Sequence, residues 1–189
     1  MRIRMAASLL LVLGMVLACA ATTLQRYDLR ELSVRARQIF VATCVATGTE
    51  RLEGRIFTRV EFEIQDMVKG RDEERVVVHF LGGEYQGTRL HLAGMPTFVE
   101  GEDVVLFLTG KDGLNHPWPV GLAQGRFSIV RDGQNHPRVF QALDGLSLHP
   151  TGAAKQAPAV DPVQGLSLDA FLERVRSLSR PAAEAPDAR

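Results

Sequence analysis

Hydrophobic and polar residues alternate most regularly over residues 56–64. Every second position there is apolar or β-branched: Ile56, Thr58, Val60, Phe62 and Ile64. A period of two places these side chains on one face of a strand and the intervening charged side chains on the other face. We therefore expect a β-strand with one buried and one solvated face, which ends at the turn Lys69-Gly70.

Two other segments are continuously apolar, which predicts strands that are covered on both faces. They are residues 39–46 (IFVATCVA), which we expect to end at Gly48, and residues 104–108 (VVLFL), which follow a polar turn. Further short strands are predicted over 75–81, 88–92, 127–131 and 138–141, which gives roughly six to eight strands separated by turn residues. This spacing predicts a mainly β domain over 21–148, either a small closed or partly open barrel or a sandwich.

Helical patterns flank the predicted strands. Asp28 is a candidate N-cap for a short helix over 28–37, and residues 168–178 carry apolar side chains at helical spacing. We expect the second helix, within residues 166–179, to dock on an apolar surface. The composition of residues 149–165 is typical of a linker, and that of 180–189 of a disordered tail.

The N-terminal residues differ from the rest of the chain. Arg2 and Arg4 precede an apolar run over 5–17, and small residues follow at 18–21 (ACAA). The run is too short to span a bilayer comfortably, so the pattern predicts an export signal peptide over residues 1–20.

Two processing routes fit this signal. Cleavage between Ala20 and Ala21 satisfies the small-x-small rule and would release the protein into the periplasm or the medium. Residues 16–19 (VLAC) also resemble a lipobox, in which Cys19 would be lipidated and would anchor the protein to the envelope, although the bulky Leu17 fits a lipobox poorly. After cleavage at Ala21, Cys44 is the only cysteine, and we interpret it as a small core residue. An unlipidated Cys19 could instead form a disulfide with Cys44 in an oxidising compartment.

The charge balance excludes some partners. The chain has 22 basic and 22 acidic side chains, and loss of Arg2 and Arg4 with the signal would leave 20 against 22, a net charge of −2. No basic field exists to attract nucleic acid, so we expect no nucleic-acid partner, and a membrane contact only through a lipidated Cys19.

One six-residue phrase occurs twice, as DGLNHP at 112–117 and DGQNHP at 132–137. His116 and His136 are the candidate metal ligands, because zinc and copper accept imidazole together with carboxylate. The alternative interpretation is one kind of turn used twice, because Asp-Gly favours hairpin turns and proline holds the preceding histidine extended. The turn needs fewer coincidences, and we expect no bound metal and no cofactor.

Other candidate chemistry is sparse. The sequence has no Gly-x-Ser-x-Gly elbow, His-Glu-x-x-His pair or phosphate-binding glycine loop, so we expect a protein that is not an enzyme. Glu61 and Glu63 would share a strand face at about 7 Å, a workable acid–base separation, but a solvated charged face with Arg59 is the simpler interpretation. Trp118, between two prolines, could contact a partner or pack under its loop.

The order of several segments resembles a largely uncharacterised family of small exported bacterial proteins. The segments are 22–32, 39–44, 55–58, 67–70, 81–83, 98–108 and 120–127. The most specific are the turn Gly101-Glu102 and residues 120–127 (VGLAQGRF). Members of this family usually start with an Ala-Thr-Thr-like sequence after the signal, which implies maturation at Ala21.

A more distant resemblance is to the netrin-like module of tissue inhibitors of metalloproteinases. In that OB-type barrel a helix also precedes a strand like 39–45, and a second strand runs into a turn like Lys69-Gly70. The resemblance implies an OB-like fold. Those inhibitors ligate the zinc of their target through a disulfide-tethered N-terminal cysteine, which a chain that starts at Ala21 lacks.

Together these patterns lead to three functional hypotheses. The first is an exported, non-catalytic domain that binds a protein or an envelope component. The second is a regulator or inhibitor of an exported metalloprotease. The third is an envelope lipoprotein anchored at Cys19.

Overall fold

The computed structural model describes residues 23–111, 116–141, 143, 147–150 and 163–179. Several predictions lie outside these residues: the signal peptide with Cys19, Ala20 and Ala21, most of the first DGxNHP phrase, most of the linker and the tail.

The described chain is mainly β with two α-helices, as the hydrophobic pattern predicted. In chain order the elements are β1 (Thr23–Arg26), α2 (Leu29–Arg35), β2 (Gln38–Leu52), β3 (Arg55–Lys69), β4 (Arg75–Leu81), β5 (Gly83–Tyr85), β6 (Thr88–Leu90), β7 (Asp103–Lys111), β8 (Pro117–Pro119), the 3₁₀ turn η1 (Leu122–Gly125), β9 (Arg126–Arg131), β10 (Pro137–Phe140), β11 (Ser147–Pro150), β12 (Leu166–Ser167) and α3 (Leu168–Ser179). Neither described helix is long and apolar enough to cross a membrane.

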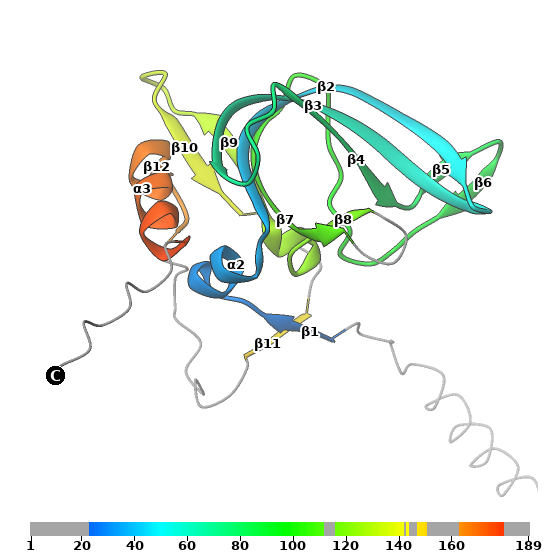
Figure 1. The fold of residues 1–189 in the computed structure, drawn as a ribbon, viewed down its shortest axis with the longest axis horizontal. Coiled ribbons are helices and arrows are strands. Elements are labelled where there is room, and N and C mark those ends of the chain that lie inside the picture. The colour runs from blue at the N-terminus through cyan, green and yellow to red at the C-terminus, as the bar shows by residue number, and fades with distance from the viewer. Residues whose placement is uncertain (1–22, 112–115, 142, 144–146, 151–162, 180–189) are drawn as a thin grey trace, which may run out of the picture.

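Eight of the described strands form one antiparallel sheet in the order β12-β10-β9-β7-β2-β3-β4, with β8 paired to β7. The sheet curls strongly, and the β5–β6 hairpin extends from one end of it (Figure 1). β1 pairs in parallel with β11 as a separate two-stranded sheet. The sheet is not a closed barrel, because β4 and β12 end the strand order without pairing to each other.

The composition of β8 explains why the sheet stays open beside β4. β8 lies near β4 but forms no ladder with it among the described residues. Its sequence is Pro-Trp-Pro, and two of its three residues have no N–H to donate. The third, Trp118, donates its backbone N–H to the Thr109 hydroxyl at 3.0 Å. β8 therefore has no backbone N–H left to pair with β4.

Two apolar clusters lie on opposite sides of the sheet. In β2, Ile39 and Val41 belong to the cluster under the helices, and Phe40, Ala42 and Cys44 belong to the cluster inside the curl. Residues 104–108 of β7 are fully buried and divide between the same two clusters. The prediction of cover on both faces is therefore confirmed for 104–108 and for 39–42, whereas Thr43, Val45 and Ala46 are only half-buried.

The two helices cover one face of the sheet (Figure 1). Asp28 caps α2 in a capping box with Glu31, as its position indicated. On α3 the buried side chains are Phe171, Leu172 and Val175, and the Phe171 ring lies 4.9 Å from that of Phe127 on β9. The predicted docking of the second helix is confirmed.

The hairpin of β2 and β3 is longer than the sequence pattern indicates. We expected a strand end at Gly48, but β2 continues to Leu52 and pairs with β3 along its whole length. The turn falls instead at Glu53 and Gly54, which have φ angles of 49° and 77°. Gly48 does not end the strand, because the pairing of β2 with β3 continues past it. The sequence of one strand does not show how far its partner extends.

Some smaller elements were not expected. They are β1, β5, β8, η1, β11 and β12, each of four residues or fewer. The last two residues of β11 fall within the predicted linker, and Val163 near its end is buried. Short elements of this kind depend on partners distant in sequence and leave little periodicity to detect.

Candidate functional site

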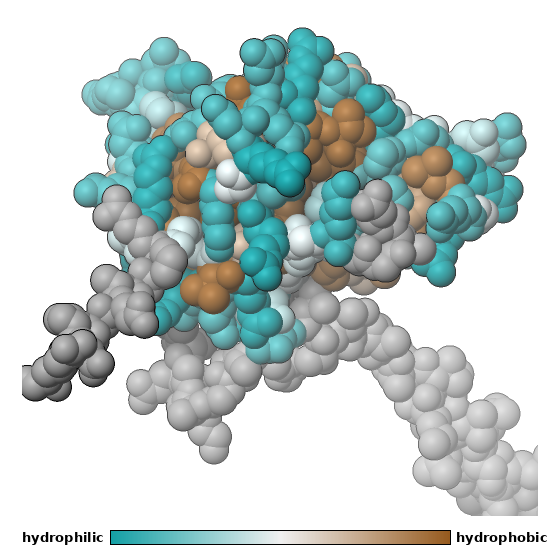
Figure 2. Space-filling view, in the orientation of Figure 1, coloured by the Kyte–Doolittle hydropathy of each residue, from teal (hydrophilic) through white to brown (hydrophobic). Residues whose placement is uncertain are grey.

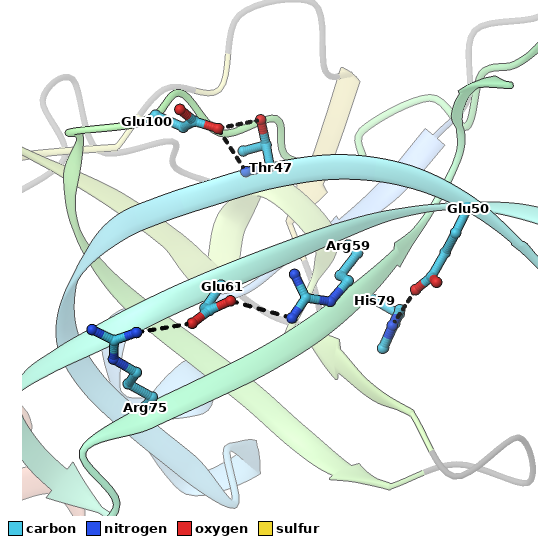
Figure 3. Close-up of polar contacts among 7 residues, drawn as sticks. All are labelled: Thr47, Glu50, Arg59, Glu61, Arg75, His79 and Glu100. Atoms are coloured by element: carbon cyan, nitrogen blue, oxygen red, sulfur yellow. Dashed lines mark hydrogen bonds and ion pairs between the residues drawn. The ribbon is translucent and has the colours of Figure 1, made fainter.

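The solvated face of β3 and β4 carries a row of ion pairs (Figure 3). Glu61 lies between Arg59 and Arg75, at 3.2 Å from each, and Arg75 also contacts Glu63 at 3.5 Å. Both carboxylates thus have guanidinium partners at a surface. The arrangement agrees with the simpler interpretation of a charged, solvated strand face.

A half-buried cluster of rings lies farther along the same face. His79 on β4 contacts Glu50 on β2 through Nε2 and Oε1 at 2.6 Å (Figure 3). The His116 ring lies 5.1 Å from the His79 ring and 5.3 Å from the ring of Phe57, which is 2% exposed. Phe57 falls on the polar face of β3, where the rings of His116 and His79 both pack against it.

The structure does not bring His116 and His136 together. His116 precedes β8, whereas His136 lies in the turn between β9 and β10, which is well separated from β8 (Figure 1). Within the described part of the chain, no group of three or more histidine, cysteine, aspartate or glutamate side chains is placed to hold a metal ion. The two candidate ligands therefore cannot share one ion.

The second DGxNHP phrase is a hairpin turn. Asp132 accepts backbone N–H bonds from Gln134 and His136, both at 2.9 Å, and a bond from Arg138 Nε at 3.1 Å. The bond from the His136 N–H is the main cause of a lowered pKa of the Asp132 carboxyl, opposed by desolvation. Asn135 has a φ of 63°, a conformation that asparagine tolerates. In this copy of the phrase, Asp132 and Asn135 therefore stabilise the turn.

Trp118 and Cys44 are the other residues singled out from the sequence. Trp118 is half-buried, and its ability to contact a partner stays a prediction. Cys44 is fully buried within the curl of the sheet, in agreement with its interpretation as a small core residue. Desolvation by burial raises the pKa of its thiol, and Glu102 and Glu100 add to the effect.

A pocket of about 350 Å³ opens where β4 ends; we call it the end pocket. The end of β4, the Gly82-Gly83 turn, the β5–β6 hairpin and residues 91–97 surround it. Its wall is largely apolar, with side chains of Phe80, Leu90, Leu92, Met95 and Pro96. An ion pair between Glu84 and Arg89 (2.7 Å) and the exposed side chain of His91 lie at its polar side.

Sequence reasoning did not find this pocket. Gly82 and Gly83 were interpreted only as the end of a strand, but their φ angles are 117° and 130°. A Cβ on Gly83 would lie 2.8 Å from the Thr58 hydroxyl, and one on Gly82 would lie 3.1 Å from the Leu90 carbonyl oxygen. The two glycines thus allow the β5–β6 hairpin to pack closely against β3. The hairpin in this position forms one wall of the end pocket.

One edge of β4, on the side where β8 lies, forms no ladder with another described strand. The carbonyl of Glu74 and the N–H of Gly82 both bond to β3, so the even-numbered residues of β4 direct their backbone groups toward β3. Those of Val77 and His79 therefore point to the open side, where no described strand pairs with them. Val77 is 39% exposed, and Figure 2 shows apolar surface among hydrophilic surface over the β3–β4 region.

No family model, curated protein or solved structure matches this chain.

Proposed function

We propose that the protein is an exported, non-catalytic binding domain whose partner is a protein or another component of the envelope. The observation that carries this proposal is the end pocket. Concave, mostly apolar pockets with a few polar groups at the rim are the usual form of a binding site. The end of β4 and the β5–β6 hairpin form one part of its wall, and residues 91–97, which belong to no strand, form the rest.

The surface chemistry supports binding rather than acid–base catalysis. The two carboxylates that could act as an acid and a base, Glu61 and Glu63, are held in ion pairs with Arg75 at an exposed face. Carboxylates that are paired with guanidinium groups in this way are typical of a solvated strand face.

We also propose that the curled sheet is an open variant of an OB-like fold. It is supported by the helix α2 before β2, by the long antiparallel pair β2–β3 and by the end of β3 at Lys69-Gly70. In this respect the chain resembles the netrin-like module, with β4 left as an open edge.

Regulation of an exported metalloprotease is the second candidate. The observation that favours it is the fixed start of the domain, where the Gln124 side chain bonds to the backbone of Tyr27 and Gln25, both at 2.8 Å. The first residues of the mature chain would therefore extend from a fixed position on the domain. An N-terminus that ligates the zinc ion of a target protease needs such a fixed position. The mechanism of the resembling inhibitors also requires a free Cys19.

Site-directed photocrosslinking in intact cells tests the first proposal. A photoreactive residue in place of Leu92, in the end pocket, should give a discrete adduct that excess unlabelled protein suppresses. The same residue in place of the exposed Glu53, at the tip of the β2–β3 hairpin, is the matched control and should give none. Turnover of a peptide, ester or glycan library by the purified mature protein would contradict the non-catalytic assignment.

A further inference from the structure

The end pocket has the size and the lining to hold one apolar side chain of a ligand. Its volume is about 350 Å³, and a cavity of roughly 150 Å³ is enough for a benzene ring. Phe80 and Met95 belong to its wall, and aromatic rings and methionine sulfur both make favourable contacts with an aromatic ring. Leu90, also in the wall, is 37% exposed. An aromatic side chain in the pocket would cover this apolar surface.

The polar side of the pocket holds an oriented guanidinium group. The Nε and Nη2 atoms of Arg89 donate to Glu84 Oε2 at 3.2 and 2.7 Å. A guanidinium has a second edge, formed by Nη1 and Nη2, which can bind another carboxylate through two parallel hydrogen bonds. Among the described residues, only Glu84 bonds to the side chain of Arg89. This second edge is therefore free for a ligand.

The chemistry of this side favours an anionic group in the ligand. The exposed imidazole of His91 also lies at the pocket and adds a ring N–H. Glu84 has one of its two oxygens engaged by Arg89. Arg89 and His91 thus offer more donors than Glu84 offers acceptors. A complementary ligand carries a carboxylate next to its apolar group.

The neighbourhood of β4 limits how a peptide can reach the pocket. β8 lies close beside β4, and the His116 ring lies 5.1 Å from the His79 ring. No extended chain fits between these two strands, so a peptide in the pocket cannot continue along β4. The end of a chain avoids this constraint, because only its last residue has to enter. A C-terminal residue also carries its side chain and a free carboxylate on the same carbon atom.

We infer that the end pocket binds the C-terminal residue of a partner protein, with an aromatic side chain against Phe80 and Met95 and the terminal carboxylate at the free edge of Arg89. This inference rests on the proposed binding function and specifies its partner. Burial of the aromatic side chain supplies affinity. The contact between guanidinium and carboxylate supplies specificity for the end of a chain.

The peptide GSGSGF, with an acetylated N-terminus and a free C-terminal carboxylate, is the probe. We expect saturable shifts of the Leu90 and Leu92 amide signals when the mature protein is titrated by NMR. Amidation of the carboxylate should weaken binding at least tenfold, and so should replacement of the phenylalanine by serine. Absence of saturable binding up to about 1 mM peptide, or equal binding of the acid and the amide, overturns the inference. These comparisons need no protein variant, so they do not depend on how a variant folds.

Protein variants locate the carboxylate. Arg89→Gln removes the free guanidinium edge and should weaken binding of the acid at least tenfold, while binding of the amide changes by less than about twofold. Arg174→Gln makes the same charge change at an exposed position of α3 and should alter neither affinity. If Arg89→Gln weakens binding of the acid and the amide equally, Arg89 does not recognise the carboxylate and the inference is wrong.

A small organic acid is the other source of the same chemistry. The compound 3-phenylpropionate carries the ring and the carboxylate without a peptide chain. We expect it to bind no more tightly than GSGSGF. Binding at least tenfold tighter than that of the peptide would overturn the inference in favour of a small free acid.

Two outcomes of the crosslinking experiment separate this inference from the proposed function. If Arg89→Gln still gives the wild-type adduct from Leu92 in cells, recognition of a chain end is wrong and the binding function stands. If the wild-type protein gives no adduct, the binding function itself fails.

Discussion

The side-chain amide of Gln124 holds the backbone of Tyr27 across 97 positions of sequence, because its Oε1 accepts the Tyr27 N–H at 2.8 Å. Its Nε2 donates to the carbonyl of Gln25, also at 2.8 Å, and the side chain is 1% exposed. Gly121 allows this contact, since a Cβ there would lie 2.7 Å from the Tyr27 ring. Two segments that carried the family resemblance, 22–32 and 120–127, thus meet through the buried side chain of Gln124.

Replacement of Gln124 should destabilise the fold. Gln124→Ala leaves the Tyr27 N–H and the Gln25 carbonyl without their partner, and we expect a loss of about 2–3 kcal/mol in the free energy of unfolding. Urea denaturation measures this loss. The control Gln134→Ala, at an exposed turn position, should change stability by less than about 0.5 kcal/mol. Equal effects of the two substitutions would contradict the role of Gln124 as a tether.

The ion pair of Glu102 and Arg126 should matter more than a surface pair. The two side chains are only 20% and 14% exposed, and the Arg126 guanidinium also lies over the Phe98 ring. Glu102→Ala leaves a shielded cation unpaired and should destabilise the protein by about 2–4 kcal/mol. Glu84→Ala breaks the exposed pair with Arg89 and should lose less than about 1 kcal/mol. Thermal unfolding of both variants measures this difference. Equal losses of stability would show that the Glu102–Arg126 pair contributes no more than a surface pair.

The lowered pKa of Asp132 predicts a pH dependence of stability. A carboxyl whose pKa is lower in the folded state stabilises the fold above its unfolded pKa of about 3.8 and loses this effect as pH falls through the folded value. Asp132→Ala should therefore flatten the stability profile on the acid side of that pKa. Urea denaturation of both proteins between pH 2 and about pH 6 tests this; parallel profiles would show that the turn bonds do not favour the ionised form.

Burial of Cys44 predicts an unreactive thiol. The side chain is fully buried and its pKa is raised, so both access and thiolate formation are unfavourable. For a mature chain that starts at Ala21, we expect labelling with an aromatic disulfide reagent to be roughly a hundredfold slower under native conditions than in denaturant. Rapid native labelling would indicate that the interior of the curled sheet opens readily.

Intact mass spectrometry of the mature protein distinguishes the three functional hypotheses. We expect an N-terminus at Ala21, because the small-x-small pattern at 18–20 fits ordinary signal cleavage. A free Cys19 would instead support the metalloprotease regulator. A diacylated or triacylated Cys19 would establish the lipid-anchored form.

Local periodicity was sufficient to predict the long strands and both helices. The alternation over 56–64, the apolar run over 104–108 and the capping residue Asp28 each depend on neighbours within one element. For the same reason the repeated DGxNHP phrase could be interpreted as a turn, and the second copy is one. Strand lengths were less predictable, because β2 extends past Gly48 only when β3 pairs with it.

The sequence by itself determined most core positions of the long strands and where the two helices begin, but not the burial of Phe57 on the polar face of β3 or of Gln124. Only the tertiary structure decided that the sheet stays open at β4, that a pocket forms beside that edge and that Gln124 reaches Tyr27. The physical reason is that burial follows from the chemistry and spacing of adjacent residues, whereas edges, pockets and tethers depend on which distant segments meet. A proline-rich β8 beside β4 leaves an edge, but nothing in either segment alone shows that they are neighbours.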